Sequence, residues 1–156
     1  MQEMFKDFNT DGVLKIGDEA LLESYRMPKQ VALYTFIRTK SKVASIVVDG
    51  IPYTISVNSI LALAPTQFLQ YIEGNDLIIY QFNQDFYCIK DHDQEVSCAG
   101  LLFFGNVHIP IIDLGLQEQR KLDTLHELAM YQLRSPTLLF SEMLRILMAR
   151  FVIIST

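Results

Sequence analysis

Four acidic or amide side chains near the N-terminus have the spacing of a calcium-binding loop. The segment DFNTDG places Asp7, Asn9 and Asp11 at alternate positions before Gly12, and Asp18 follows six residues later. Alternating oxygen ligands and a glycine at the sharp turn are what such a loop requires. However, Asp18 replaces the usual bidentate Glu, and only six residues are available for an entering helix. We therefore expect a solvated loop here, and we predict no metal site.

Histidines and cysteines are the other residues that could bind a metal or react. The histidines are His92, His108 and His126, and no two of them form a His-x-His pair. His92 lies in the polar run KDHDQE, which is typical of a surface loop. Cys88 and Cys98 lie ten residues apart and could form a redox switch, but buried free cysteines that pack as small apolar side chains are more common. No phosphate-binding glycine loop or serine-nucleophile motif is present, so we predict no catalytic residues and no cofactor.

Aromatic side chains and one arginine are candidates for binding a small molecule. In the run VALYTFIRT, alternation places Tyr34, Phe36 and Arg38 on one face of a strand. An arginine on an aromatic face could bind a carboxylate or a sugar hydroxyl inside a β-barrel. The alternative, which we favour, is that Arg38 ends the strand and points to water. The candidate ligand-binding residues are Tyr34, Phe36, Arg38, Tyr53, Tyr80, Phe82 and Tyr87.

Short apolar runs separated by turn residues must position these side chains. From residue 31 onward the runs are rich in Ile, Val, Tyr and Phe, which predicts an antiparallel sandwich or barrel. Asp49-Gly50, between KVASIVV and YTISV, predicts a hairpin, because both central residues of a type I′ turn need positive φ. Residues 1–29 are mixed in pattern, and a short helix is expected over Glu19–Met27.

After Pro110 the apolar spacing becomes helical. A first helix is expected over residues 117–133, and a second from Thr137 onward that is apolar nearly all round. Such a helix must be covered on more than one side, by the first helix and by either the barrel or a second subunit. The helical pattern still runs at Thr156, so we expect the natural polypeptide to continue. The residues expected at a dimer interface are Leu122, Leu125, Ala129, Met143, Leu147 and Phe151.

The composition is that of a folded protein without a nucleic-acid footprint. The chain has 156 residues, of which half are apolar, and a net charge of −5. DNA binding would need clustered Lys and Arg. No secretory signal is visible, and the most apolar stretch, residues 143–154, carries two arginines and is too short to span a bilayer. We expect a cytoplasmic protein with reduced thiols and no membrane contact.

Three stretches resemble the N-terminal effector-binding and dimerisation domain of AraC-type transcription regulators, particularly those of the Bacteroidetes. They are ILALAPTQFLQY (60–71), FYCIKDHDQEVSCAGLLFFG (86–105) and EMLRILMARFVI (142–153). The resemblance implies a mainly β fold with C-terminal helices, in which a cupin-like antiparallel barrel (a double-stranded β-helix) precedes two α-helices. The implied divisions are an N-terminal segment (1–29), the barrel (30–114) and a helical dimerisation element (115–156).

The resemblance also implies ligand-dependent regulation of transcription without enzymatic activity. The barrel would bind a small-molecule effector, and the helices would hold a homodimer so that two DNA-binding halves meet two half-sites. A C-terminal pair of helix-turn-helix modules, absent from this chain, would make the DNA contact. Because the last helix would lead into that module, a shift in its packing could reposition the module.

Two other functions stay open. The first is a stand-alone metal-dependent cupin enzyme, an isomerase or oxygenase, which needs three or four ligands converging inside the barrel. Metal-binding cupins use a His-x-His pair, which this chain lacks. The second is a dimerising scaffold that senses nothing, for which a solidly packed barrel would be expected. Stoichiometric Fe, Mn, Ni or Zn in the purified protein would favour the enzyme.

Overall fold

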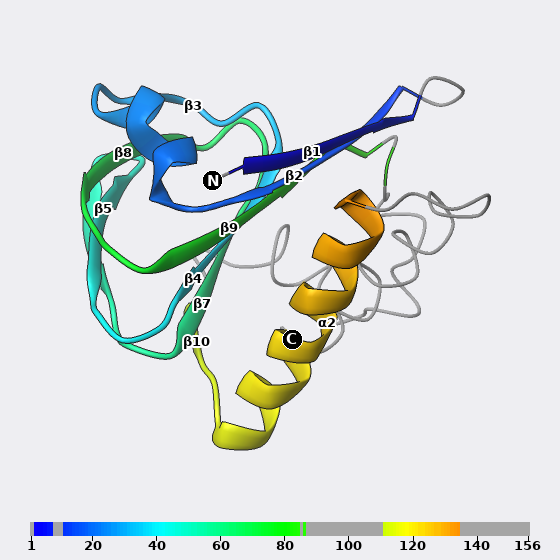
Figure 1. The fold of residues 1–156 in the computed structure, drawn as a ribbon. Coiled ribbons are helices and arrows are strands. Elements are labelled where there is room, and N and C mark those ends of the chain that lie inside the picture. The colour runs from blue at the N-terminus through cyan, green and yellow to red at the C-terminus, as the bar shows by residue number, and fades with distance from the viewer. Residues whose placement is uncertain (1, 8–10, 85, 87–110, 135–156) are drawn as a thin grey trace, which may run out of the picture.

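The computed structural model describes residues 2–7, 11–84, 86 and 111–134 (Figure 1). Over these residues the chain is mainly β with antiparallel pairing, followed by a helix, so the predicted fold class is confirmed. The expected second helix, from Thr137, lies outside the described residues. The elements are β1 (Gln2–Asp7), β2 (Gly12–Gly17), the 3-10 helix η1 (Glu19–Tyr25), β3 (Lys29–Gln30), β4 (Tyr34–Thr39), β5 (Ala44–Val48), β6 (Ile51–Ile55), β7 (Ser59–Leu63), β8 (Phe68–Glu73), β9 (Leu77–Phe82), β10 (Ile111–Asp113) and α2 (Leu116–Arg134).

Two antiparallel sheets enclose the first apolar core. One sheet has the strand order β1-β2-β9-β4-β7-β10 and the other the order β3-β8-β5-β6. Ile37 and Ile79 of the larger sheet and Ile46, Ile55 and Leu69 of the smaller one belong to a single buried cluster between them. Alternation directs these residues inward, because successive side chains of a strand point to opposite faces.

The other face of the six-stranded sheet is also buried, beneath α2. Figure 1 shows β4, β7 and β9 between the smaller sheet on one side and α2 on the other. Leu14, Phe36 and Phe82 form a second buried cluster with Leu122 and Ala129 of the helix. All six residues of β4 are therefore buried, which is why its sequence lacks the usual alternation of apolar and polar residues.

The N-terminal segment contributes strands to the larger sheet, so the expected solvated loop is wrong over Gly12–Gly17, while residues 8–10 lie outside the described residues. Strands β1 and β2 pair from Gln2↔Gly17 to Asp7↔Gly12, and β2 continues the sheet by pairing with β9. Leu14 and Ile16 are fully buried, and their burial outweighs the polar composition around them. Asp18 caps η1, which ends two residues earlier than the helix expected over Glu19–Met27.

The Asp49-Gly50 hairpin is confirmed. Strands β5 and β6 pair up to Val48↔Ile51, and the two turn residues have φ values of 51° and 82°. The carboxylate of Asp49 also accepts a hydrogen bond from the backbone N–H of Phe68 at 2.9 Å, which ties the turn to β8.

Gly50→Ala is expected to destabilise the protein through backbone strain alone. A Cβ at position 50 would meet nothing within 4 Å, so only the positive φ penalises alanine, by about 1–2 kcal/mol. Urea unfolding followed by circular dichroism measures the difference. Asp49→Asn is the control, because asparagine tolerates positive φ and keeps an acceptor oxygen. Equal stability of Gly50→Ala and wild type would contradict a strained turn.

Candidate functional site

Arg38 lies buried between the six-stranded sheet and α2, so the interpretation that it points to water is wrong. The residue is 1 % exposed. Its Nη1 lies 2.9 Å from Oδ1 of Asp123, and its Nη2 donates to the carbonyl of Gln119 at 3.4 Å. The Nη1 contact is an ion pair by distance but is not aligned as a hydrogen bond, and Nε has no hydrogen-bond partner among the described residues. The strand pattern alone could not show that a helix would cover this face.

A second polar contact joins the same sheet and helix. The Tyr80 hydroxyl lies 2.8 Å from Nδ1 of His126, and the two rings meet edge to face at 5.8 Å. Burial raises the pKa of Tyr80, which keeps the phenol protonated. Burial, followed by the charges of Arg38 and Lys40, lowers the pKa of His126. The Tyr80 hydroxyl and a neutral His126 therefore share one hydrogen bond, and the tautomer of the ring sets which of the two groups donates.

Five of the seven candidate ligand-binding residues share one face of the sheet, the one covered by α2. Tyr34 and Phe36 stack against Phe82, with ring centroids 5.5 and 6.3 Å apart. Arg38 and Tyr80 make the helix contacts described above. Tyr53 lies on β6 and packs against the core between the sheets. Tyr87 lies outside the described residues.

The candidate dimer residues fall into two groups, those that pack against the chain's own sheet and those outside the described residues. Leu122 and Ala129 are buried on the chain's own sheet, and Leu125 packs against the same cluster. Met143, Leu147 and Phe151 lie outside the described residues. A contact between subunits through α2 would therefore use the opposite face of this helix.

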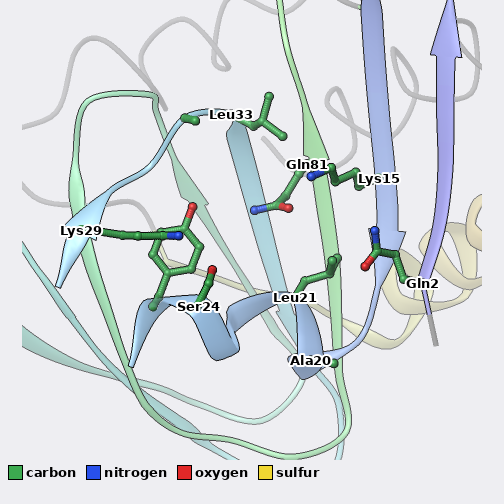
Figure 2. Close-up of a pocket in the computed structure, with 10 residues that line it drawn as sticks. Gln2, Lys15, Ala20, Leu21, Ser24, Lys29, Leu33 and Gln81 are labelled. Carbon is green, nitrogen blue, oxygen red and sulfur yellow. The ribbon is translucent and has the colours of Figure 1, made fainter. Parts of the chain in front are cut away.

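A cleft of about 340 Å³ opens on the side of β9 away from α2 (Figure 2). Its polar lining residues are Gln2, Lys15, Ser24, Lys29 and Gln81. Its apolar lining comes from Ala20, Leu21, Tyr25, Ala32 and Leu33. The sequence pattern does not reveal the cleft, because its lining comes from six separate segments that contribute one to four residues each, namely β1, β2, η1, β3, β9 and the segment before β4. One signal was present, namely Gln81 as a polar residue within the apolar run LIIYQF.

Two strands contribute consecutive residues to the cleft and to the contact with α2. On β9, Gln81 lines the cleft and Tyr80 contacts His126. On β1, Gln2 lines the cleft, and Glu3 pairs with Arg134 of α2 at 3.4 Å. Because neighbouring residues of a strand point to opposite faces, a displacement of either strand changes contacts both in the cleft and with α2.

Metal-ligating residues do not gather in the described part of the chain. No group of three or more His, Cys, Asp or Glu side chains that could hold a metal ion occurs there. His92, His108, Cys88 and Cys98 lie outside it. Among the described residues, no helix is long and apolar enough to cross a membrane.

Comparison with known proteins gives similar structures but no sequence relative. No family model and no curated protein matches the chain. The AraC-like transcriptional activator CuxR is 9 % identical with a TM-score of 0.43, over 97 % of this chain and 50 % of that one. An apo ToxT variant from Vibrio cholerae strain SCE256 is 13 % identical with a TM-score of 0.46, over 94 % and 56 %. ToxT from Vibrio cholerae O395, bound to (E)-4-(8-methylnaphthalen-1-yl)but-3-enoic acid, is 11 % identical with a TM-score of 0.45, over 96 % and 53 %. The chain thus spans about half the length of these proteins, and similarity at this level does not assign it to a family.

Asp123→Asn should destabilise the sheet–helix contact by about 1–3 kcal/mol, because it leaves the buried guanidinium of Arg38 without a counter-charge. Urea unfolding measures the loss. Lys40→Ala is the matched control, since Lys40 is a more exposed partner of the same carboxylate, at 3.4 Å, and exposed pairs contribute at most about 1 kcal/mol. An equal loss of unfolding free energy in both variants would contradict the conclusion that buried Arg38 depends on Asp123 for its counter-charge.

The His126 contact should weaken in mild acid. The pKa of His126 is lowered from 6.5 in the folded state, so the unfolded chain binds the proton more readily. The stability that neutral His126 provides is full above about pH 6.5 and is lost as the pH falls from there towards the folded-state pKa. Unfolding free energies of wild type and His126→Gln, measured from pH 8 to pH 5, should therefore converge towards the acid end. A constant difference across this range would contradict a neutral His126.

Proposed function

We propose that this chain is the ligand-sensing and dimerisation domain of an AraC-type transcription regulator, located in the cytoplasm. The three resembling stretches and the order of a β unit followed by α2 support the proposal. The observation that carries it is that Tyr80 and Gln81 are consecutive residues of β9. Gln81 lines a ligand-sized cleft, and Tyr80 contacts His126 of the helix. In such a regulator, DNA would be bound through C-terminal helix-turn-helix modules.

Sensing works through the strands that border the cleft. A ligand that contacts Gln81 or Gln2 stabilises one position of β9 or β1 relative to the rest of the sheet. The same strands contact α2 through Tyr80 and Glu3, so the packing of α2 depends on whether the cleft is occupied. Small shifts of a packed helix are an established way of repositioning an attached domain. A ligand shifts this equilibrium only by its difference in affinity for the two positions.

Dimerisation uses the face of α2 that the sheet leaves open. Leu128 is 47 % and Tyr131 is 62 % exposed. The two residues are three apart, so they are neighbours on one helical face, opposite the buried Leu122 and Ala129. Aromatic and leucine side chains on an otherwise polar helix face supply the apolar contact that a subunit interface needs.

The double variant Leu128→Asp/Tyr131→Asp is expected to be monomeric at concentrations where the wild-type chain is dimeric. Two carboxylates at the centre of an apolar contact would be desolvated without partners. Sedimentation equilibrium measures the change, with circular dichroism as the check on folding. Gln117→Asp, on the same face near the start of the helix, is the control and should remain dimeric.

Regulation is tested by joining the chain to a monomeric helix-turn-helix module that represses a reporter only as a dimer. Wild type should repress the reporter, and the double variant should not. A wild-type chain that stays monomeric at about 100 µM, well above the dissociation constant of a functional dimer, would contradict the proposal.

A further inference from the structure

We propose that the free edge of β1 pairs with the same strand of a second copy of this chain, antiparallel and with Met4 opposite Met4. The contact uses the backbone of a strand at the end of the six-stranded sheet (Figure 1). It is separate from the face of α2 that carries Leu128 and Tyr131, and it needs neither a ligand nor the proposed function.

Three of the four outer edges of the two sheets are unsuited to pairing. Strand β3 has two residues and β10 has three, too few to hold another strand. Strand β6 carries Pro52. In a two-residue hairpin the closing pair, here Val48 and Ile51, turns its hydrogen-bonding groups inward, so the nitrogen of Pro52 faces the free edge and has no hydrogen to donate. Short edges and prolines are the usual ways in which proteins prevent sheets from joining.

Strand β1 has neither of these protections. It has six residues, none of them proline or glycine. Its backbone has no partner on the side away from β2 in the described part of the chain. Gln2, Met4 and Lys6 are exposed, and Met4 has 50 % of its surface open to solvent. An open row of N–H and C=O groups is a template for another strand, so β1 is the edge at which a partner can add.

Charge selects how two copies of β1 align. Facing residues of antiparallel strands point to the same side of a sheet, so a two-fold axis must place one residue opposite itself. Centring the axis on Glu3 or on Lys6 opposes two like charges, and the register between Met4 and Lys6 opposes Glu3 to Asp7. Like charges directly opposite each other destabilise a sheet. Centring on Met4 avoids every such pair and sets Gln2 opposite Lys6, whereas registers nearer the strand ends leave few pairs.

The second copy would also contribute a side chain to the cleft. Gln2 lines the cleft, and Lys6 points to the same face of β1 by alternation. In the register centred on Met4, Lys6 of the second copy lies opposite Gln2 and brings its ammonium group to the rim of the cleft. Pairing also holds the strand whose Glu3 contacts Arg134 of α2 at 3.4 Å. Association of two copies therefore acts on both the cleft and the end of the helix.

The strand contact should be weak by itself. Two six-residue strands bury much less than the roughly 1,200 Å² of a stable interface. We therefore expect pairing through β1 at higher concentrations than dimerisation through α2. A disulfide placed on the two-fold axis captures such a contact.

The test is oxidative cross-linking of Met4→Cys at about 100 µM with oxidised glutathione as the oxidant. Directly opposite residues have Cα atoms about 4.5–5.5 Å apart, within the range of a disulfide. The variant should form at least about tenfold more covalent dimer than wild type, whose Cys88 and Cys98 set the background. Circular dichroism confirms that each variant is folded.

Gln2→Cys and Lys6→Cys are the matched controls on the same exposed face. Each residue lies four positions from its own counterpart, about 13 Å along the strand, so neither variant should cross-link with itself above background. A mixture of the two should cross-link, because these positions face each other across the axis. The mass of the product identifies the mixed dimer.

Two results would overturn the inference: no covalent dimer of Met4→Cys above background, or equal cross-linking of Lys6→Cys with itself. Loss of the Met4→Cys cross-link in the Leu128→Asp/Tyr131→Asp background would contradict a contact separate from α2. Failure of the proposed function looks different. A Met4→Cys chain that cross-links in the expected register, while wild type shows no α2-dependent dimer in sedimentation, would uphold the strand contact and contradict the α2 interface.

Discussion

A positive charge enclosed between sheet and helix sets where α2 lies on the larger sheet. Arg38 projects from a strand buried on both faces, where an unpaired guanidinium would be very costly. Among the described residues, α2 supplies the counter-charge, through Asp123, and a backbone acceptor, through Gln119. Sliding the helix by one turn would separate these groups, so the pair sets the position of α2 along the sheet. Only the Arg38 end of this pair is buried, since the Asp123 side chain is 44 % exposed, so the cost of leaving the guanidinium unpaired is what holds the two groups together.

Strand alternation then separates the two sides of the larger sheet. On β9, the side chains of Tyr80 and Phe82 point to the helix, and that of Gln81 between them points to the cleft. The register Lys15↔Gln81↔Thr35 aligns a row of polar side chains across three strands. A slip of one residue would place this row beneath α2 and the aromatic rings in the cleft. The same pairing thus maintains both the cleft and the helix contact.

The sequence predicted what depends on local pattern. The mainly β fold, the Asp49-Gly50 turn and the helix over residues 117–133 follow from positive-φ preferences and from apolar period, and α2 spans Leu116–Arg134. Alternation also placed Tyr34, Phe36 and Arg38 on one face. It could not show which partner covers that face, because the helix that does so is distant in sequence. The cleft was missed for the same reason, since its lysines come from β2 and β3 and meet only once the sheets have formed.

The two strands that connect the cleft and the helix differ in how firmly they are paired, and this difference decides which of them moves more easily. Strand β9 pairs with β4 along its whole length and with β2 from Ile79 to Phe82, so moving it breaks two sets of hydrogen bonds. Strand β1 is an edge strand with one neighbour, and its Glu3–Arg134 contact reaches the end of α2. A ligand held against the fixed amide of Gln81 would therefore draw the softer elements, β1 and η1, towards β9. The end of α2 at Arg134 would respond first, while Arg38 and Asp123 keep the middle of the helix in place.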